Sequence, residues 1–229
     1  MKNNIDVVFF DLFFTLVVPK YNELRNENDV LGITKDEWES YAEDDELYLK
    51  RATSKSINPK QIIEDILNKM KIDVSECTKK QILKLREDRL KNSLINVDPT
   101  ILNVLLDIKN SGKKLCLISN ADIIDVKYWD KSPLHNLFDA TIFSYEVGYL
   151  KPQKEIYKIA LKRMEVNPKN SVFIGDGGSD ELKGAKELGI RTILTGHLLK
   201  REIKPHNEIK KFADYHIEDF KDLIDIINH

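Results

Sequence analysis

The segment Val7–Val17, with the sequence VVFFDLFFTLV, places one carboxylate, Asp11, after a run of large apolar residues. The β-branched and aromatic side chains of positions 6–11 predict a buried strand with Asp11 at its carboxyl end. Two aromatic residues, Phe13 and Phe14, follow the acid. Burying a lone carboxylate is costly unless a cation or a proton accompanies it. The residues that follow the other predicted strands therefore decide whether Asp11 is functional.

Size and composition indicate an ordinary globular protein with one medium core, or a core with a smaller appendage. The chain has 229 residues, of which 41% are hydrophobic and 32% charged, and its net charge is -2. This charge gives no support to a nucleic-acid or membrane partner. We expect a small-molecule substrate, and a chain that is a monomer or a homodimer.

The chain shows no feature of a membrane or secreted protein. Its longest apolar stretch, about a dozen residues around Asp11, is too short to cross a bilayer and does not resemble a signal peptide. The two cysteines, Cys77 and Cys116, are far apart and lack metal-site spacing. A reduced, cytoplasmic protein is therefore expected.

Residues 20–95 contain helical patterns and no strand candidate. Thr34 is a predicted N-cap, and apolar positions at roughly helical spacing continue from it to Leu49. Asn58-Pro59 opens a second helix and Thr78 a third. This segment is therefore predicted to be an all-helical insert.

From Asp98-Pro99 onward, strands and helices alternate. Strands are predicted over residues 114–119, 140–144, 171–175, 191–195 and 215–217. Such alternation is typical of an α/β fold with a doubly wound, mostly parallel sheet. We predict a core domain formed by residues 1–19 and 96–229, with a helical domain inserted over residues 20–95.

The residues just after the strands are those that would bind a ligand, because open parallel sheets bind ligands beyond their carboxyl ends. Asp11 and Asp176 are two carboxylates that suit Mg²⁺. Ser119-Asn120 and Lys151 offer donors and a positive charge for a phosphoryl group. Alone, Asp11 and Ser119-Asn120 are more often turn or cap residues and Lys151 is a solvated lysine, whereas Asp176 in a Gly-Asp-Gly-Gly turn is more telling. The conjunction of these residues is what indicates a site.

With these residues in this order, the sequence resembles the haloacid dehalogenase superfamily of hydrolases. The four motifs of the resemblance are Asp11-Leu12-Phe13-Phe14-Thr15, Ser119-Asn120, Lys151-Pro152, and Gly175-Asp176 followed by Asp180-Glu181. The segments that carry them cover roughly half of the chain. The resemblance implies a Rossmann-like core, and the insert occupies the position of the α-helical cap of the family's first subclass.

The resemblance also implies roles for these residues. Asp11 would be the nucleophile of an aspartyl intermediate, held by Thr15. Lys151 would neutralise Asp11 and the transferring group. Oxygens of that group would be bound by Lys151, Ser119 and Asn120, and by the backbone after Asp11 at Leu12 and Phe13.

A magnesium ion is the cofactor that the resemblance implies. Its ligands would be Asp11, the backbone carbonyl of Phe13 and Asp176. A further acid, Asp180 or Glu181, would support the ion, and the spacing does not choose between them.

The chain departs from the family pattern at Phe13. Phosphatases of the family carry a second aspartate there as general acid and base, and Phe13 can perform neither role. Phe14 also replaces the usual glycine. A magnesium-dependent phosphohydrolase remains the favoured prediction, because phosphoryl transfer depends mainly on positioning and electrostatics.

Two alternatives remain open at this stage. Dehalogenases of the family also carry an aromatic residue at this position, and Arg25 is the nearby candidate for binding a carboxylate; a phosphonate-cleaving variant would need a cap lysine. A non-catalytic protein that binds a phosphorylated ligand is the other alternative, since two aromatic residues beside Asp11 could close the pocket.

Overall fold

The computed structural model describes residues 5–54, 57–200 and 203–228. Its centre is a six-stranded sheet in the order β3-β2-β1-β4-β5-β6, and every pairing is parallel. The strands are β1 (Val7–Phe10), β2 (Lys114–Ser119), β3 (Ala140–Phe143), β4 (Ser171–Gly175), β5 (Arg191–Thr195) and β6 (Tyr215–Ile217). The predicted α/β fold with a parallel sheet is confirmed.

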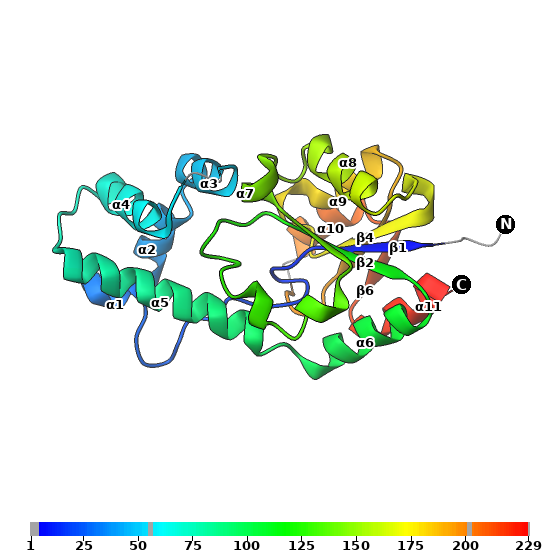
Figure 1. Ribbon diagram of the computed structural model, residues 1–229, viewed down its shortest axis with the longest axis horizontal. Coiled ribbons are helices and arrows are strands. Elements are labelled where there is room, and N and C mark those ends of the chain that lie inside the picture. The colour runs from blue at the N-terminus through cyan, green and yellow to red at the C-terminus, as the bar shows by residue number, and fades with distance from the viewer. Residues whose placement is uncertain (1–4, 55–56, 201–202, 229) are drawn as a thin grey trace.

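Helices cover both faces of the sheet, as Figure 1 shows. On one face lie α6 (Pro99–Asn110) and α11 (Leu223–Asn228), and on the other α8 (Lys154–Arg163) and α9 (Glu181–Glu187). Alternate residues of β1 enter the two cores, Val8 and Phe10 one and Val7 and Phe9 the other. This explains why the strand sequence is apolar at every position.

Helices are the only regular elements among the described residues of the insert, 20–54 and 57–95. Its helices are α1 (Glu27–Leu31), α2 (Lys35–Ala42), α3 (Asp45–Ala52), α4 (Pro59–Met70) and α5 (Glu76–Ile95), and α6 follows on the core side. They enclose an apolar core of their own around Trp38, Ile63 and Ile66. The insert lies beyond one end of the sheet, and α5 leads back to α6 (Figure 1). The expected domain boundaries stay a prediction.

Two of the predicted helix limits are wrong. The helix that begins after Thr34 ends at Ala42, because Asp44 caps a new helix by accepting a hydrogen bond from the Leu47 amide at 3.2 Å. The third predicted helix begins at Glu76 rather than after Thr78, because the Ser75 hydroxyl accepts from the Thr78 amide at 3.1 Å.

Short elements complete the core. They include α7 (Ser144–Val147) after β3 and α10 (Ile203–Lys210) between β5 and β6.

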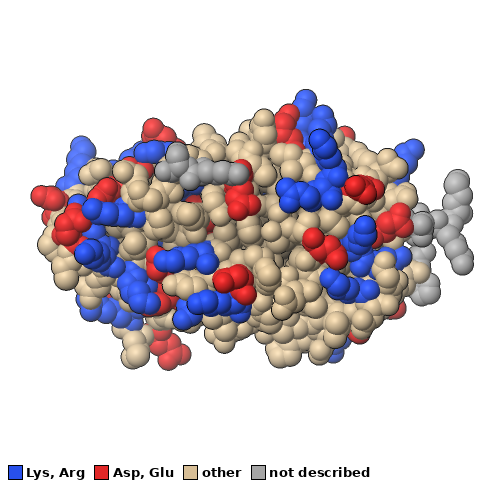
Figure 2. Space-filling model, viewed as in Figure 1, with Lys and Arg blue, Asp and Glu red and all other residues tan. Residues whose placement is uncertain are grey.

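No helix among the described residues is long and apolar enough to span a membrane. On the face in Figure 2, basic and acidic side chains are interspersed rather than gathered in one cationic patch.

Candidate active site

The structure brings Asp11 and Lys151 into direct contact, although 140 positions separate them in the sequence. Lys151 Nζ donates to Asp11 Oδ1 and also to Glu181 Oε2, the latter at 2.5 Å. The three side chains are buried, with Lys151 only 3% exposed. Asp11 and Glu181 converge because β1 lies next to β4 and the carboxyl ends of parallel strands meet at one edge of the sheet, and Lys151 reaches this edge from the turn between α7 and α8.

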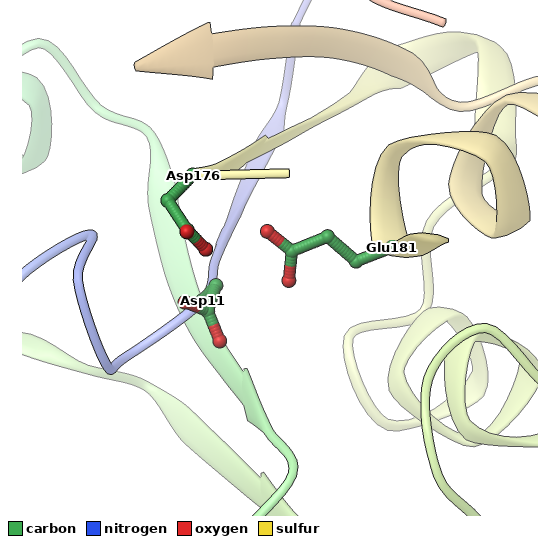
Figure 3. Close-up of side chains that lie close together, drawn as sticks. All are labelled: Asp11, Asp176 and Glu181. Atoms are coloured by element: carbon green, nitrogen blue, oxygen red, sulfur yellow. The ribbon is translucent and has the colours of Figure 1, made fainter. Parts of the chain in front are cut away.

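Three buried carboxylates meet at this edge. One oxygen each from Asp11, Asp176 and Glu181 lies within 4.8 Å of the other two. In Figure 3, Asp11 and Asp176 extend from the ends of two strands, and Glu181 reaches towards them from the start of α9. This arrangement offers hard oxygen ligands of the kind that Mg²⁺ binds.

Glu181, and not Asp180, is the acid that the turn after β4 directs into the cluster. Ser179 and Asp180 adopt left-handed backbone conformations, with φ of 52° and 51°, and both side chains are exposed. The Glu181 carboxylate instead accepts from the Gly177 amide at 3.1 Å. A Cβ at Gly175 would lie 2.0 Å from Glu181 Oε1, so this glycine makes room for the carboxylate.

Other predicted site residues lie close to Asp11. The Thr15 hydroxyl donates to Asp11 Oδ2 at 3.0 Å, as the resemblance implies. Ser119 is fully buried at the end of β2. Asn120 fixes the Lys151 backbone, since its Oδ1 accepts from the Lys151 amide at 2.7 Å and its Nδ2 donates to the Lys151 carbonyl at 3.1 Å.

Phe13 lies at the junction of core and insert, where it packs against both apolar cores. Phe14 has a φ of +63° and donates its amide to the Val17 carbonyl at 2.6 Å. A left-handed backbone is unfavourable for a bulky residue and explains why glycine is usual at this position. The backbone after Asp11 therefore keeps the turn that the motif requires despite Phe14.

A cavity of about 510 Å³ opens above the carboxylates. Its floor includes Asp11, Phe13, Lys151, Asp176 and Glu181, so Phe13 and Phe14 do not close the pocket. Leu12, Ser119 and Asp180 are not among the residues that line it. The insert contributes the opposite wall through α2, α3 and α5.

Two buried arginines of the insert, which sequence reasoning missed, pair with acids of the core, and one of them, Arg86, lines this cavity. Arg86 of α5 is buried and lies 3.5 Å from Asp125 and 3.7 Å from Asp122, both in the loop after β2. Arg51 of α3 donates to Asp122 at 2.9 Å. These ion pairs join insert and core. No local periodicity could have revealed them, because the partners lie 36 or more positions apart.

Burial sets the protonation of the acidic cluster. Burial and the nearby Asp11 carboxylate raise the pKa of Glu181 to about 8. Burial also raises the pKa of Asp11, opposed by Lys151. Burial alone would lower the pKa of Lys151, but Asp11 and Glu181 raise it above its usual value. Without a further cation, the cluster therefore holds a proton near neutral pH.

This protonation predicts how the stability of the metal-free protein depends on pH. The folded protein retains the Glu181 proton up to about pH 8, whereas the unfolded chain releases it near pH 4.5. The contribution of this proton to stability is therefore fully present below about pH 4.5 and is lost as pH rises to about 8. Melting temperatures measured in EDTA should fall across this window.

Glu181→Gln serves as the control, because an amide does not titrate. We expect the melting temperature of this variant to fall less steeply with pH. Mg²⁺ should flatten the pH dependence of the wild-type melting temperature, because the ion replaces the proton. A wild-type melting temperature that rises from pH 5 to pH 8 in EDTA would contradict the assigned protonation.

Comparisons with known proteins agree with this geometry. A family model described as a haloacid dehalogenase-like hydrolase matches residues 5–189. A glyceraldehyde 3-phosphate phosphatase of Methanocaldococcus jannaschii is 33% identical over 143 residues, a match that spans 61% of this chain and only 60% of that protein.

Solved structures share the fold. The L-2-haloacid dehalogenase of Xanthobacter autotrophicus superposes with a TM-score of 0.65 at 17% identity, covering 97% of this chain and 98% of that one. A family enzyme of Bacteroides thetaiotaomicron, in complex with magnesium and inorganic phosphate, has a TM-score of 0.65 at 24% identity and covers 87% and 98%. The family match, which extends over well over half of the chain, confirms the resemblance: the chain belongs to the haloacid dehalogenase-like hydrolases.

Proposed function

We propose that the protein is a magnesium-dependent phosphohydrolase that acts on a small phosphorylated metabolite through an aspartyl-phosphate on Asp11. One observation carries the proposal: Asp11 contacts Lys151 inside a buried cluster of three carboxylates at the floor of a cavity. An ammonium group that pairs with a nucleophile can also pair with a phosphoryl oxygen.

The donor set fits a divalent cation. Three ionised carboxylates and one ammonium leave two negative charges uncompensated in a buried place, which is unfavourable without a cation. Asp11, Asp176 and Glu181 would hold Mg²⁺, together with the predicted Phe13 carbonyl. The ion would supply charge neutralisation for the phosphoryl group and Asp11.

Side chains of the protein position the nucleophile, the lysine and the phosphoryl group. Thr15 fixes one oxygen of Asp11, so that the other oxygen faces Lys151 and the cavity. Asn120 holds the Lys151 backbone in place. Ser119 and the amides of Leu12 and Phe13 are proposed to donate to the phosphoryl oxygens, and such positioning is the main source of catalysis in phosphoryl transfer.

The substrate class is inferred from the relatives and the cavity. The curated relatives include glyceraldehyde 3-phosphate phosphatases of several archaea, which act on a small phosphorylated molecule. A cavity of about 510 Å³ suits a substrate of that size.

A dehalogenase reaction is the second candidate, favoured by the aromatic side chain of Phe13. Arg25, the arginine considered for carboxylate binding, is exposed and does not line the cavity. Among the described lining residues Lys151 is the only lysine, so a Schiff-base lysine from the cap has no support there. Magnesium-dependent release of phosphate from an aryl phosphate would support the phosphohydrolase, and metal-independent halide release from haloacids would overturn it.

We expect Phe13→Asp to hydrolyse alkyl phosphates faster than Phe13→Asn does, by up to ~10²-fold, because only the first variant has an acid at this position. The two variants lose the same packing at the junction of core and insert, so their ratio isolates the acid. The measurement is kcat/KM for an alkyl phosphate with Mg²⁺. Equal rates for the two variants would show that an acid at this position does not assist the reaction.

A further inference from the structure

One buried carboxyl group of the cavity has no role in the reaction described so far. Asp125 lies in the loop after β2, lines the same cavity as Asp11 and is 7% exposed. The other carboxylates of that wall, Glu39 and Glu43, are far more accessible, with side chains 43% and 51% exposed. Of these three acids that line the cavity, Asp125 is therefore the one most protected from solvent.

The surrounding structure fixes the Asp125 carboxyl group. Its Oδ2 accepts from the Asp122 amide at 2.9 Å, and its Oδ1 lies 3.5 Å from Arg86 Nη2. The preceding Ile124 is fully buried in the apolar core of the insert. The loop therefore contacts both insert and core. Asp125 Oδ1 has only the 3.5 Å contact with Arg86 Nη2.

Arg86 gives independent evidence that a polar ligand group belongs here. Its side chain is 3% exposed and lines the cavity, yet its Nε has no hydrogen-bond acceptor among the described residues, and its Nη1 has only Glu43 Oε1 at 3.6 Å, beyond hydrogen-bond distance. Buried donors without acceptors are costly. An oxygen of a bound leaving group would satisfy them, and it would lie beside Asp125.

The charged groups around Asp125 come from four parts of the chain. Asp122 lies in its own loop, Arg86 on α5, Arg51 and Tyr48 on α3, and Glu43 just after α2. Burial and then Asp122 raise the pKa of Asp125 to about 7, against the lowering effect of Arg86 and Arg51. A pKa close to neutral pH suits a group that must both donate and accept a proton.

Tyr48 is the other group of this wall that could donate a proton. Burial, followed by the Asp125 charge, raises the pKa of its phenol further above the ordinary value. A general acid works best when its pKa lies near the working pH. Tyr48 therefore fits the role less well than Asp125.

We propose that Asp125 is the general acid that replaces the aspartate missing at Phe13. The inference rests on the proposed phosphohydrolase function. Asp11 Oδ1 attacks phosphorus, and the bond between phosphorus and the ester oxygen breaks with its electron pair on that oxygen. The Asp125 proton moves to this oxygen, which leaves as an alcohol. Asp125, now ionised, accepts a proton from the water that hydrolyses the aspartyl-phosphate, which restores both residues.

The test compares two phosphate esters in Asp125→Asn and in the wild type. An alkyl phosphate needs protonation of its leaving oxygen, whereas para-nitrophenyl phosphate has a stable leaving anion. We expect the ratio of alkyl to aryl kcat/KM to fall by ~10²-fold in the variant. Adding Phe13→Asp to the variant should restore the ratio, and adding Phe13→Asn should not.

A purely structural role predicts a different result. If Asp125 only joins insert and core, both substrates lose rate equally and the ratio stays constant, which would overturn the proposal. The wild type gives a second measurement that needs no variant: its alkyl rate should fall above about pH 7 while its aryl rate does not. Identical profiles would also overturn it. Absence of wild-type hydrolysis of either ester would instead refute the phosphohydrolase function itself.

Discussion

Asp11→Asn is expected to lower hydrolysis of any phosphate ester by ~10⁴-fold or more, because the amide cannot form the covalent intermediate. The substitution keeps the size of the side chain, and its amide can still accept from Thr15. It also removes one negative charge next to Lys151 and Glu181. We therefore expect a folded protein whose melting temperature is at least that of the wild type, so that the lost activity reports chemistry.

Asp6→Asn is the matched control for this variant. Asp6 lies just before the opposite end of β1, is exposed and accepts from Asn170 Nδ2 at 2.8 Å. The same substitution there should leave kcat/KM within about two-fold, as expected for surface changes. Substantial activity in Asp11→Asn, with the control unaffected, would show that a residue other than Asp11 forms the bond to phosphorus.

Removal of the divalent cation has the second largest expected effect. EDTA should lower the rate by ~10³-fold or more, and added Mg²⁺ should restore it, since metal stabilisation of transferring charge contributes several kcal/mol. The structural reason is the uncompensated charge of Asp11, Asp176 and Glu181 beside a single ammonium. Isothermal titration of the EDTA-treated protein with Mg²⁺ measures the binding directly.

A pair of variants tests which acid supports the ion. Glu181→Gln should weaken Mg²⁺ binding by ~10–100-fold, as is typical for residues that orient a metal site. Asp180→Asn should change it little, because Asp180 is exposed and lies outside the cluster. The reverse order of effects would show that the turn after β4 rearranges when the ion binds.

The convergence of Asp11 and Asp176 could be predicted from the sequence because topology determines it. Apolar runs mark β1 and β4, and each run ends in an aspartate. Neighbouring parallel strands then carry both acids to the same edge. The helical nature of the insert could also be predicted from the sequence, since N-caps and apolar spacing are local signals.

The choice between Asp180 and Glu181 could not be made from spacing. It depends on two consecutive left-handed residues, Ser179 and Asp180, which immediately precede α9. Neither residue type requires that conformation, so the sequence gives no signal for it. The ion pairs of Arg86 with Asp125 and of Arg51 with Asp122 could not be predicted for another reason. They depend on how the insert docks onto the core.

A crystal structure of the protein with Mg²⁺ and beryllium fluoride, an aspartyl-phosphate mimic, tests the central claim most directly. We predict the fluoride complex on the carboxylate of Asp11 and in contact with Lys151. The ion should lie ~2.0–2.1 Å from oxygens of Asp11 and Asp176, with the ring of Phe13 beside the pocket and not within it. A mimic bound away from Asp11, or a cluster that takes up no ion at saturating Mg²⁺, would contradict the account.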